Sequence, residues 1–145
     1  MKILISKSPE QTKKIAAQIV QKLQPGDILA LSGDLGGGKT TFVQGIARAL
    51  KIKQNITSPT FVLLKSYRIF KQKFKNLIHI DLYRLKNLKE TEALGLSDFL
   101  GKANNICVVE WAEKIKRLLP PKTIWLEFDF IDQNTRQIKI KGLVL

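Results

Sequence analysis

Hydrophobic positions along the chain follow two spacings, one typical of amphipathic helices and one typical of buried strands. In the N-terminal part, apolar residues recur at intervals of three and four, which predicts a helix with one buried face. Ser8 and Pro9 suit the first positions of this helix, Gln11 completes a capping box, and Pro25 and Gly26 end it. Its apolar face consists of Ile15, Ala16, Ile19, Val20 and Leu23.

Other segments have the continuous apolar character of strands that are buried on both faces. The first is residues 28–31, and glycine-rich residues separate it from a second amphipathic helix. The inner face of that helix consists of Phe42, Val43, Ile46, Ala47 and Leu50. Further strands are predicted at residues 61–67, 77–82, 106–110, 123–128 and 137–141, and helical segments at residues 89–100 and 113–118.

The interleaving of strands and helices predicts an α/β fold. We expect a sandwich in which helices flank a mixed, mostly parallel central sheet. The last two predicted strands are separated by residues 132–135, whose polar, turn-forming character predicts an antiparallel hairpin. The chain shows no internal repeat and no linker, so we expect a single domain over residues 1–145.

The amino-acid composition restricts the classes of function that the chain can have. The chain carries 25 Lys and Arg against 12 Asp and Glu, a formal charge of +13, and such an excess attracts polyanions such as nucleic acid. The alternative is that these lysines only solvate the surface, because they are spread along the chain without an aromatic RNA-binding signature. No apolar run approaches the ~18 residues needed to cross a bilayer, and a single cysteine, Cys107, excludes an internal disulfide. We therefore expect a cytoplasmic protein with no membrane segment and a core thiol.

Residues 33–41 carry the strongest chemical signal in the chain. The phosphate-binding pattern G-x-x-x-x-G-K-[ST] lies between a predicted strand and a predicted helix, and its residues include Gly33, Gly36, Gly37, Gly38, Lys39 and Thr40. The glycines let successive N–H groups turn towards phosphate oxygens, and the helix N-terminus adds partial positive charge. In such loops Lys39 bridges the β- and γ-phosphates, Thr40 ligates Mg²⁺ and Thr41 donates to the α-phosphate. The segment predicts a site for a nucleoside triphosphate and Mg²⁺.

Two acidic residues stand at the carboxyl ends of predicted strands, where a metal-binding acid is expected. Asp81 follows the apolar residues 77–80, and Glu110 follows the uninterrupted apolar run 106–109. Either residue is a candidate to hold Mg²⁺, directly or through water, and either can orient the attacking water. We therefore expect Lys39, Asp81 and Glu110 to form the catalytic set. His79 alternates with apolar neighbours, which favours a hydrogen-bonded structural histidine over a catalytic one.

Four further segments occur in a recognisable order around the P-loop: Thr57-Ser-Pro-Thr-Phe61, His79-Ile-Asp-Leu-Tyr-Arg-Leu85, Glu92-Ala-Leu-Gly-Leu-Ser-Asp-Phe-Leu100 and Val109-Glu-Trp-Ala-Glu-Lys-Ile115. With these segments the chain resembles the bacterial TsaE (YjeE) family, the P-loop ATPases of tRNA threonylcarbamoyladenosine biosynthesis. The likeness runs from Pro9 to Arg136. The P-loop alone is common to many families, whereas the other segments together are specific.

The resemblance implies a P-loop NTPase-like fold, ATP as the nucleotide, and roles for particular residues. Thr40 and Glu110 correspond to the Mg²⁺ ligands of the family, and Asp81 matches a further functional acid. The positions implied near the base and the sugar or phosphates are Pro9, Thr12 and Arg136. The candidates for a switch or for the partner surface are Ser58, Thr60, Tyr83, Arg84 and Trp111.

The resemblance also implies partners. These are a threonylcarbamoyltransferase subunit and its paralogous non-catalytic partner, with tRNA contacting the chain directly or through the complex. In the family the ATPase is slow alone and cycles this complex. Two alternatives stay open, a small-molecule kinase and a switch or tRNA-binding module that binds ATP with little turnover. A GTPase is disfavoured because the chain has no Asn-Lys-x-Asp guanine signature.

Overall fold

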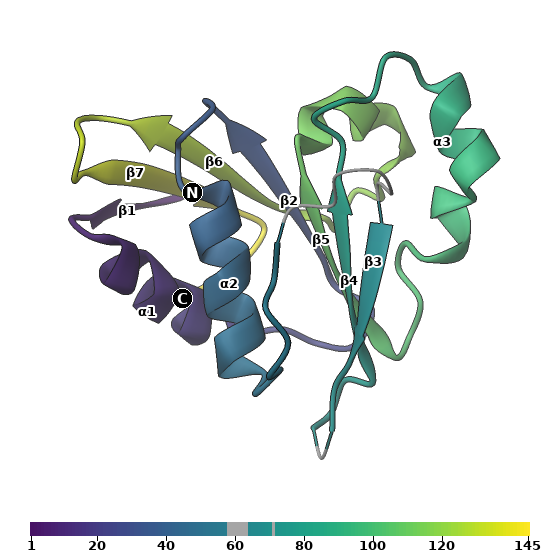
Figure 1. Ribbon diagram of the computed structural model, residues 1–145, viewed down its shortest axis with the longest axis horizontal. Coiled ribbons are helices and arrows are strands. Elements are labelled where there is room, and N and C mark those ends of the chain that lie inside the picture. Colours follow the sequence, from purple (N-terminus) through teal and green to yellow (C-terminus); the bar gives the residue numbers. More distant parts are fainter. Residues whose placement is uncertain (58–63, 71) are drawn as a thin grey trace.

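A seven-stranded sheet runs through the centre of the computed structural model, which describes residues 1–57, 64–70 and 72–145 (Figure 1). The strands lie in the order β1-β7-β6-β2-β5-β4-β3. Their bounds are β1 Lys2–Ser6, β2 Ile28–Gly33, β3 Leu64–Arg68, β4 Asn76–Asp81, β5 Asn105–Glu110, β6 Ile124–Phe130 and β7 Arg136–Lys141. The four inner strands, β6, β2, β5 and β4, are parallel, and antiparallel strands flank them on both sides. This arrangement confirms the predicted mixed sheet and its C-terminal hairpin.

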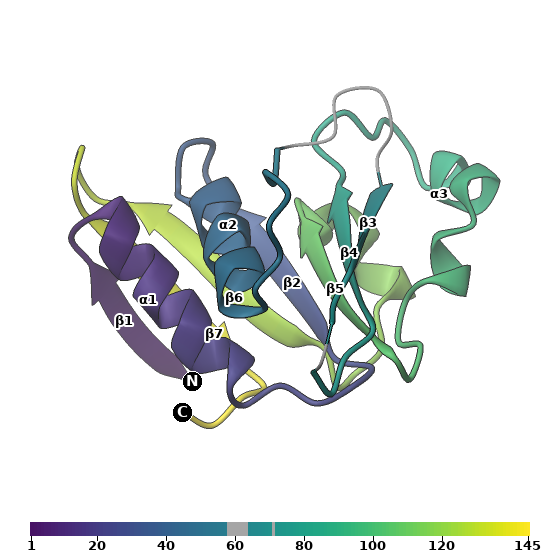
Figure 2. The same ribbon diagram turned by 60° about the horizontal axis from the view of Figure 1, so that its bottom comes forward.

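Helices cover both faces of the sheet. They are α1 Pro9–Val20, α2 Lys39–Ala49, α3 Lys89–Leu94 and the 3₁₀ segments η1 Leu96–Asp98 and η2 Ala112–Leu118. Figure 2 shows α1 and α2 side by side over one face, and α3 stands at the other end of the sheet. Within the described ranges, no helix is both long enough and apolar enough to cross a membrane.

Strand β2 separates the two halves of the core, as its continuous apolar run predicts. Leu29 and Leu31 pack into the cluster formed with α1 and α2, whereas Ile28 and Ala30 pack into the cluster on the opposite face, with η1 and η2. All four side chains are buried. Because period-two alternation sends successive side chains to opposite faces, a strand covered on both sides must be apolar at every position.

The start of α1 follows the predicted capping pattern. The side chain of Ser8 accepts a hydrogen bond from the backbone N–H of Gln11 at 3.0 Å. The Gln11 side chain accepts in turn from the backbone N–H of Lys7 at 2.7 Å, one residue before the cap. The first bond satisfies a donor that a helix N-terminus leaves without an intrahelical partner. The second differs by one residue from the predicted capping box, in which Gln11 would accept from the N–H of Ser8 itself.

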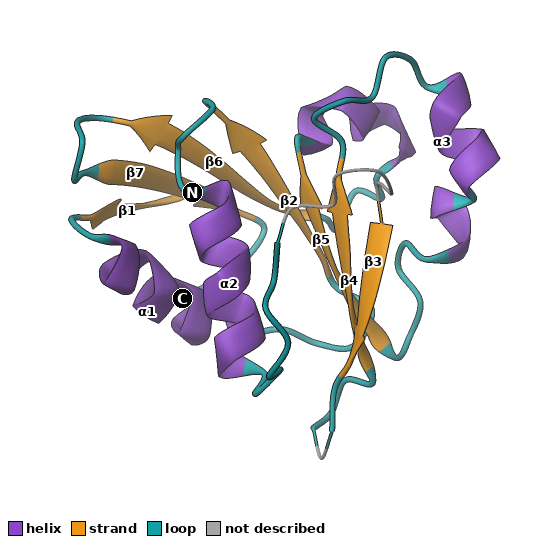
Figure 3. Ribbon diagram, viewed as in Figure 1, coloured by secondary structure: helices purple, strands orange, loops and turns teal. Residues whose placement is uncertain are grey.

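Three differences from the expected elements have physical reasons. Strand β1 was not predicted, because its residues pair only with β7 at the other end of the chain and alternate weakly in polarity. The helical segment expected over residues 89–100 is divided at Gly95, whose φ of +64° ends α3 before η1 begins (Figure 3). The strand predicted from residue 61 is described from Leu64 onwards, and residues 61–63 lie outside the described part of the chain.

Candidate functional site

A cleft of about 380 Å³ opens at the carboxyl ends of the parallel strands, beside the N-terminus of α2. It brings together predicted site residues from distant parts of the chain: Pro9, Thr12, Gly36, Gly37, Gly38, Lys39, Thr40, Thr41, Asp81, Tyr83, Arg84, Glu110, Trp111 and Arg136. Leu35, Gln133 and Asn134 also line it and were not predicted. Ser58 and Thr60, the switch candidates, lie outside the described residues.

The P-loop has the backbone that its glycines predict. Gly33 has a φ of +116°, and a Cβ placed there would lie 2.1 Å from the Phe128 carbonyl oxygen, so this position admits only glycine. Gly33 is therefore needed for the close approach of β2 to β6 and is not among the described residues that line the cleft. Gly38, with a φ of +99°, directs the chain into α2, whose N-terminus has no side-chain cap. The first-turn N–H groups of α2 are thus placed at the cleft, where an anion is their natural partner.

Lys39 lies across the loop. Its Nζ donates to the carbonyl oxygens of Gly33 and Asp34, at 2.7 Å each, and lies 4.2 Å from the centre of the Trp111 ring. No salt bridge among the described residues includes Lys39, and burial lowers the pKa of its ammonium group. A largely buried ammonium group whose hydrogen bonds to the described part of the chain are all to carbonyls is suited to exchange those bonds for phosphate oxygens.

Glu110, at the end of β5, is held between two partners. Its Oε1 accepts a hydrogen bond from the Thr40 hydroxyl at 3.0 Å, and its Oε2 lies 2.6 Å from Nε2 of His79. His79 and Glu110 are both buried, and His79 Nδ1 has no hydrogen-bond partner within the described residues. A proton on Nδ1 would lack an acceptor, so the favoured tautomer carries its proton on Nε2 and donates it to Glu110. His79 is thus hydrogen-bonded, as predicted, and its contact fixes the orientation of the carboxylate.

Asp81 lies directly beside Glu110, because the two residues are register partners on β4 and β5. Its Oδ1 accepts a hydrogen bond from the backbone N–H of Tyr83 at 3.0 Å. The side chain is buried at the edge of the cleft, at 8% exposure. Two strand-end carboxylates therefore face the same cleft, one bonded to Thr40 and the other to the chain that leaves β4.

The opposite wall of the cleft is formed by residues near the two ends of the chain, on α1 and at the start of β7. Arg136, at the start of β7, donates from Nε to the Gly36 carbonyl at 3.0 Å and from Nη1 to the Asp132 carbonyl at 2.6 Å. The Asp132 side chain accepts from the N–H groups of Asn134 and Thr135, which closes the turn and holds the pKa of this carboxyl below its usual range. The same turn places Gln133 and Asn134 in the cleft, and their position beside Arg136 in a predicted hairpin turn was the signal available for finding them.

Thr12, on α1, completes this wall. Its hydroxyl lies 2.7 Å from the hydroxyl of Ser6, and the Ser6 hydroxyl donates to the Ser8 carbonyl at 2.9 Å. Because the Ser6 proton is used in that bond, Thr12 donates to Ser6. Ser6 was missed at the sequence level, since its role depends on the unpredicted strand β1.

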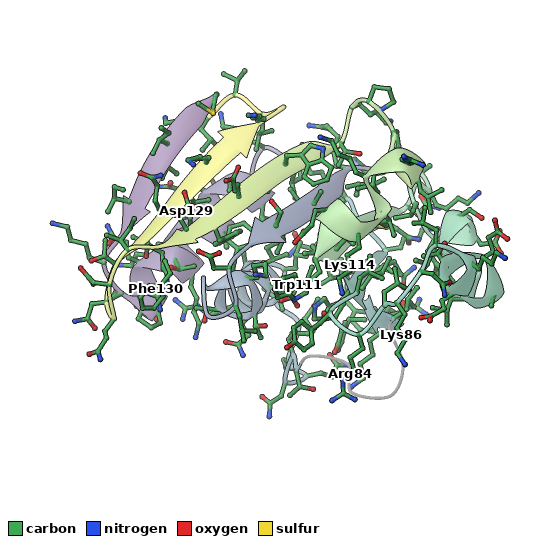
Figure 4. All side chains as sticks on the ribbon, turned by 90° about the horizontal axis from the view of Figure 1, so that it is seen from above. Arg84, Lys86, Trp111, Lys114, Asp129 and Phe130 are labelled. Atoms are coloured by element: carbon green, nitrogen blue, oxygen red, sulfur yellow. The ribbon has the colours of Figure 1, made fainter. Side chains whose placement is uncertain are left out.

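Aromatic and basic side chains surround the mouth of the cleft. The rings of Tyr83 and Trp111 lie 5.2 Å apart, and Lys114 donates from Nζ to the Tyr83 carbonyl at 2.6 Å. Figure 4 shows Trp111 and Lys114 next to each other, with Arg84 and Lys86 on the same side of the molecule. Trp111 has a left-handed backbone, with a φ of +59°, which is rare for a bulky residue and is a feature of functional sites. Tyr83 is 51% exposed, so the mouth presents an aromatic surface to solvent.

The residues present fit a nucleotide-bound magnesium ion better than a metal held by the protein alone. Among the described residues, no group of three or more His, Cys, Asp or Glu side chains is placed to hold a metal ion. The Thr40 hydroxyl and the Glu110 carboxylate are adjacent oxygen donors, which is the ligand type that Mg²⁺ prefers. Magnesium typically takes one or two such protein ligands and completes its shell with phosphate oxygens and water.

The parallel strands, the glycine-rich loop that opens α2 and the strand-end acids beside it define a P-loop NTPase fold. A crystal structure of YdiB from Bacillus subtilis superposes on this chain with a TM-score of 0.75 at 32% identity, covering 96% of this chain and 83% of that one.

Sequence comparisons identify the family. The model of the threonylcarbamoyl adenosine biosynthesis protein TsaE matches residues 6–138. The chain is 41% identical to the tRNA threonylcarbamoyladenosine biosynthesis protein TsaE of Rickettsia felis, over 95% of this chain and 78% of the relative, and 40% identical to that of Aquifex aeolicus, over 97% and 96%. The chain therefore belongs to the TsaE family, and its role is in tRNA threonylcarbamoyladenosine biosynthesis.

Proposed function

We propose that the chain is a Mg²⁺-dependent ATPase that turns over slowly alone and cycles the threonylcarbamoyltransferase complex in this modification. The observation that carries the proposal is the cleft in which Lys39, Thr40 and Glu110 meet at the N-terminus of α2. Family membership gives the biological process, and the contacts within the cleft support the chemical roles proposed below for its residues.

In this proposal, different side chains of the cleft bind the phosphates, ligate the metal and exclude water. MgATP, when bound, supplies the phosphoanhydride bond and the metal charge that lowers the barrier to its cleavage. Lys39 gives up its bonds to the Gly33 and Asp34 carbonyls and binds phosphate oxygens, together with the N–H groups of the loop. Thr40 and Glu110 provide oxygen ligands on the metal side. Trp111 covers Lys39 and limits the access of water to it.

Glu110 is better placed than Asp81 to be the metal-side acid. Its Oε1 already contacts Thr40, and His79 holds its Oε2, so one oxygen is directed to the metal side of the cleft. Asp81 lies beside it but is bonded to the chain that leads to the cleft mouth. We assign to Asp81 the orientation of the attacking water.

The partner complex docks, in this proposal, at the mouth of the cleft. The exposed Tyr83 ring and the neighbouring Trp111 give the aromatic anchors that are enriched at protein interfaces. Lys114 connects the η2 segment to the Tyr83 backbone, so contact at this surface can reach the residues around Asp81. Such a connection accounts for turnover that rises when the partners bind.

The test is ATP hydrolysis by the purified chain with Mg²⁺, alone and with the threonylcarbamoyltransferase subunit and its paralogous partner. We expect low turnover alone, stimulation by the partners, and loss of both in Lys39→Ala, which removes the phosphate-binding ammonium group. Binding of ATP without stimulation under any partner condition would contradict the proposal. Phosphate transfer to a small molecule would indicate a kinase, and binding without turnover would indicate a nucleotide switch.

A further inference from the structure

A second groove lies at the C-terminal end of α2, the end away from the P-loop. It has a volume of about 780 Å³. In Figure 1 the chain turns at the end of α2 and runs back beside that helix, and this return segment forms one wall. The residues that line the groove are Lys13, Gln44, Ala47, Arg48, Lys51, Ile52, Lys53, Gln54, Asn55, Ile56 and Thr57. We refer to these residues as the basic groove.

The charge of the basic groove has one sign. Four of its residues are basic, namely Lys13, Arg48, Lys51 and Lys53, and none of the described lining residues is acidic. Gln44, Gln54, Asn55 and Thr57 add neutral hydrogen-bonding groups. Glu10 forms an ion pair with one of these cations, Arg48, and both side chains of the pair are more than half exposed. Exposed pairs of this kind are weak and exchange readily for other partners.

Lys51 occupies a position that normally favours glycine. It has a φ of +59° and stands just past the end of α2. Its N–H bonds to the Arg48 carbonyl at 3.1 Å, and the next N–H, of Ile52, bonds to the Ala47 carbonyl at 3.0 Å, which is the Schellman pattern. A lysine in this left-handed position is less stable than glycine, so its side chain is a candidate for a role outside folding.

The wall that carries these cations is anchored. Ile52 and Ile56 pack against the hydrophobic core, and the side chain of Gln44 donates to the Ile56 carbonyl at 3.4 Å. Lys51 and Lys53 therefore project from a segment that is fixed at both ends. A fixed array of cations binds a charged ligand with less loss of entropy than free side chains do.

We propose that the basic groove binds the phosphate backbone of RNA. Its lining is rich in lysine and contains no aromatic residue among the described positions, which is unlike a protein-binding surface and like a backbone-binding one. The net charge of +13 adds long-range attraction for a polyanion. Because none of the described lining residues is aromatic and able to stack on a base, we expect the groove to contact phosphates and not bases. This inference concerns a site separate from the nucleotide cleft and does not depend on ATP hydrolysis.

The experiment measures binding of the 145-residue chain to an unmodified tRNA transcript by fluorescence anisotropy, at salt concentrations from about 50 to about 200 mM. The test variants are Lys51→Gly and Lys53→Gln. The matched control is Lys141→Gln, which removes the same charge from an exposed position on β7. Each test variant should weaken binding about five- to tenfold near 0.1 M salt and reduce the salt slope by about 0.7–0.9, as expected for one lost phosphate contact. Lys141→Gln should change neither quantity appreciably.

Lys51→Gly also separates binding from folding. Because glycine adopts a positive φ without strain, this variant should unfold at the same urea concentration as the parent chain or at a higher one, while RNA binding falls. Equal losses in Lys141→Gln would overturn the proposal in favour of a general surface-charge effect, and no tRNA binding at 50 mM salt would also overturn it. Unchanged tRNA binding with weaker binding to the partner proteins would instead assign the groove to an acidic protein surface.

Discussion

The buried side chain of His79 holds the buried carboxylate of Glu110 through a hydrogen bond. The only hydrogen bond that the His79 side chain makes among the described residues is to Glu110, a residue that is 2% exposed. His79→Leu removes the donor and leaves a buried carboxylate oxygen without it, so we expect a loss of about 1–3 kcal/mol in the free energy of unfolding. Urea denaturation measures this loss. His79→Gln keeps a donor and should recover part of the stability, and a leucine variant as stable as the parent would show that the pair contributes nothing.

Cys107 permits a residue-scale test without mutation, because it is the only cysteine in the chain. The thiol is 1% exposed and donates to the Phe99 carbonyl, and burial raises its pKa from 9.0 to about 11. The thiolate fraction at pH 8 is therefore about 100-fold below that of the unfolded chain, and labelling by a disulfide reagent should be slower by at least that factor. Rapid labelling of the native chain would show that the Cys107 thiol is not buried in the core.

The same thiol predicts a pH dependence of stability. The folded chain holds the Cys107 proton more tightly than the unfolded chain, so the contribution of this group is fully present below pH 9 and is lost as the pH rises towards 11. Cys107→Ala isolates the contribution of the thiol, because every other titratable group is the same in the two chains. The stability difference between the parent chain and this variant should shrink over that interval, as measured by urea unfolding at each pH.

At the scale of elements, the packing of α1 on α2 depends on Gly45. A Cβ placed there would lie 2.7 Å from the Cα of Lys13 and 2.9 Å from the Cβ of Ala16. Gly45→Ala should therefore push the helices apart and lower the free energy of unfolding by about 1–3 kcal/mol, even though alanine is the better helix former. Thermal unfolding measures the effect. Adding Ala16→Gly should restore only part of the loss, because the contact with Lys13 is to backbone.

The pattern of polar and apolar residues predicted most helices and strands, because the signal for each of them lies within a few neighbouring residues. Strand β2 is apolar at each buried position, and the cap of α1 is complete within residues 7–11. Strand β1 was missed because its pairing with β7 joins the two ends of the chain, and such pairing leaves no local signal. The break at Gly95 was also missed, because a glycine inside a helical pattern can be tolerated or can end the helix, and only the backbone angle distinguishes these outcomes.

At the scale of the whole molecule, the cleft combines local and non-local contributions. The P-loop was predictable because its motif is contiguous, and Asp81 and Glu110 were predictable because parallel strands deliver their carboxyl ends to one edge. Gln133 and Asn134 enter the cleft only because β6 and β7 form a hairpin that folds over the P-loop through Arg136. The Thr12 side of the cleft likewise depends on β1, through Ser6.

Because the cleft is built from α1, the P-loop, β5 and the β6–β7 turn, we expect MgATP that binds there to stabilise the entire fold. Binding at 100 times the dissociation constant adds about 2.7 kcal/mol to the stability of the folded state. In a domain of this size that corresponds to a rise of about 5–10 °C in the unfolding temperature. Differential scanning fluorimetry with ATP and Mg²⁺ measures the rise, and Lys39→Ala, which lacks the ammonium group facing the loop, should show little of it. GTP should give a smaller shift than ATP. An equal shift with GTP would leave phosphate binding in place and remove the support for adenine preference.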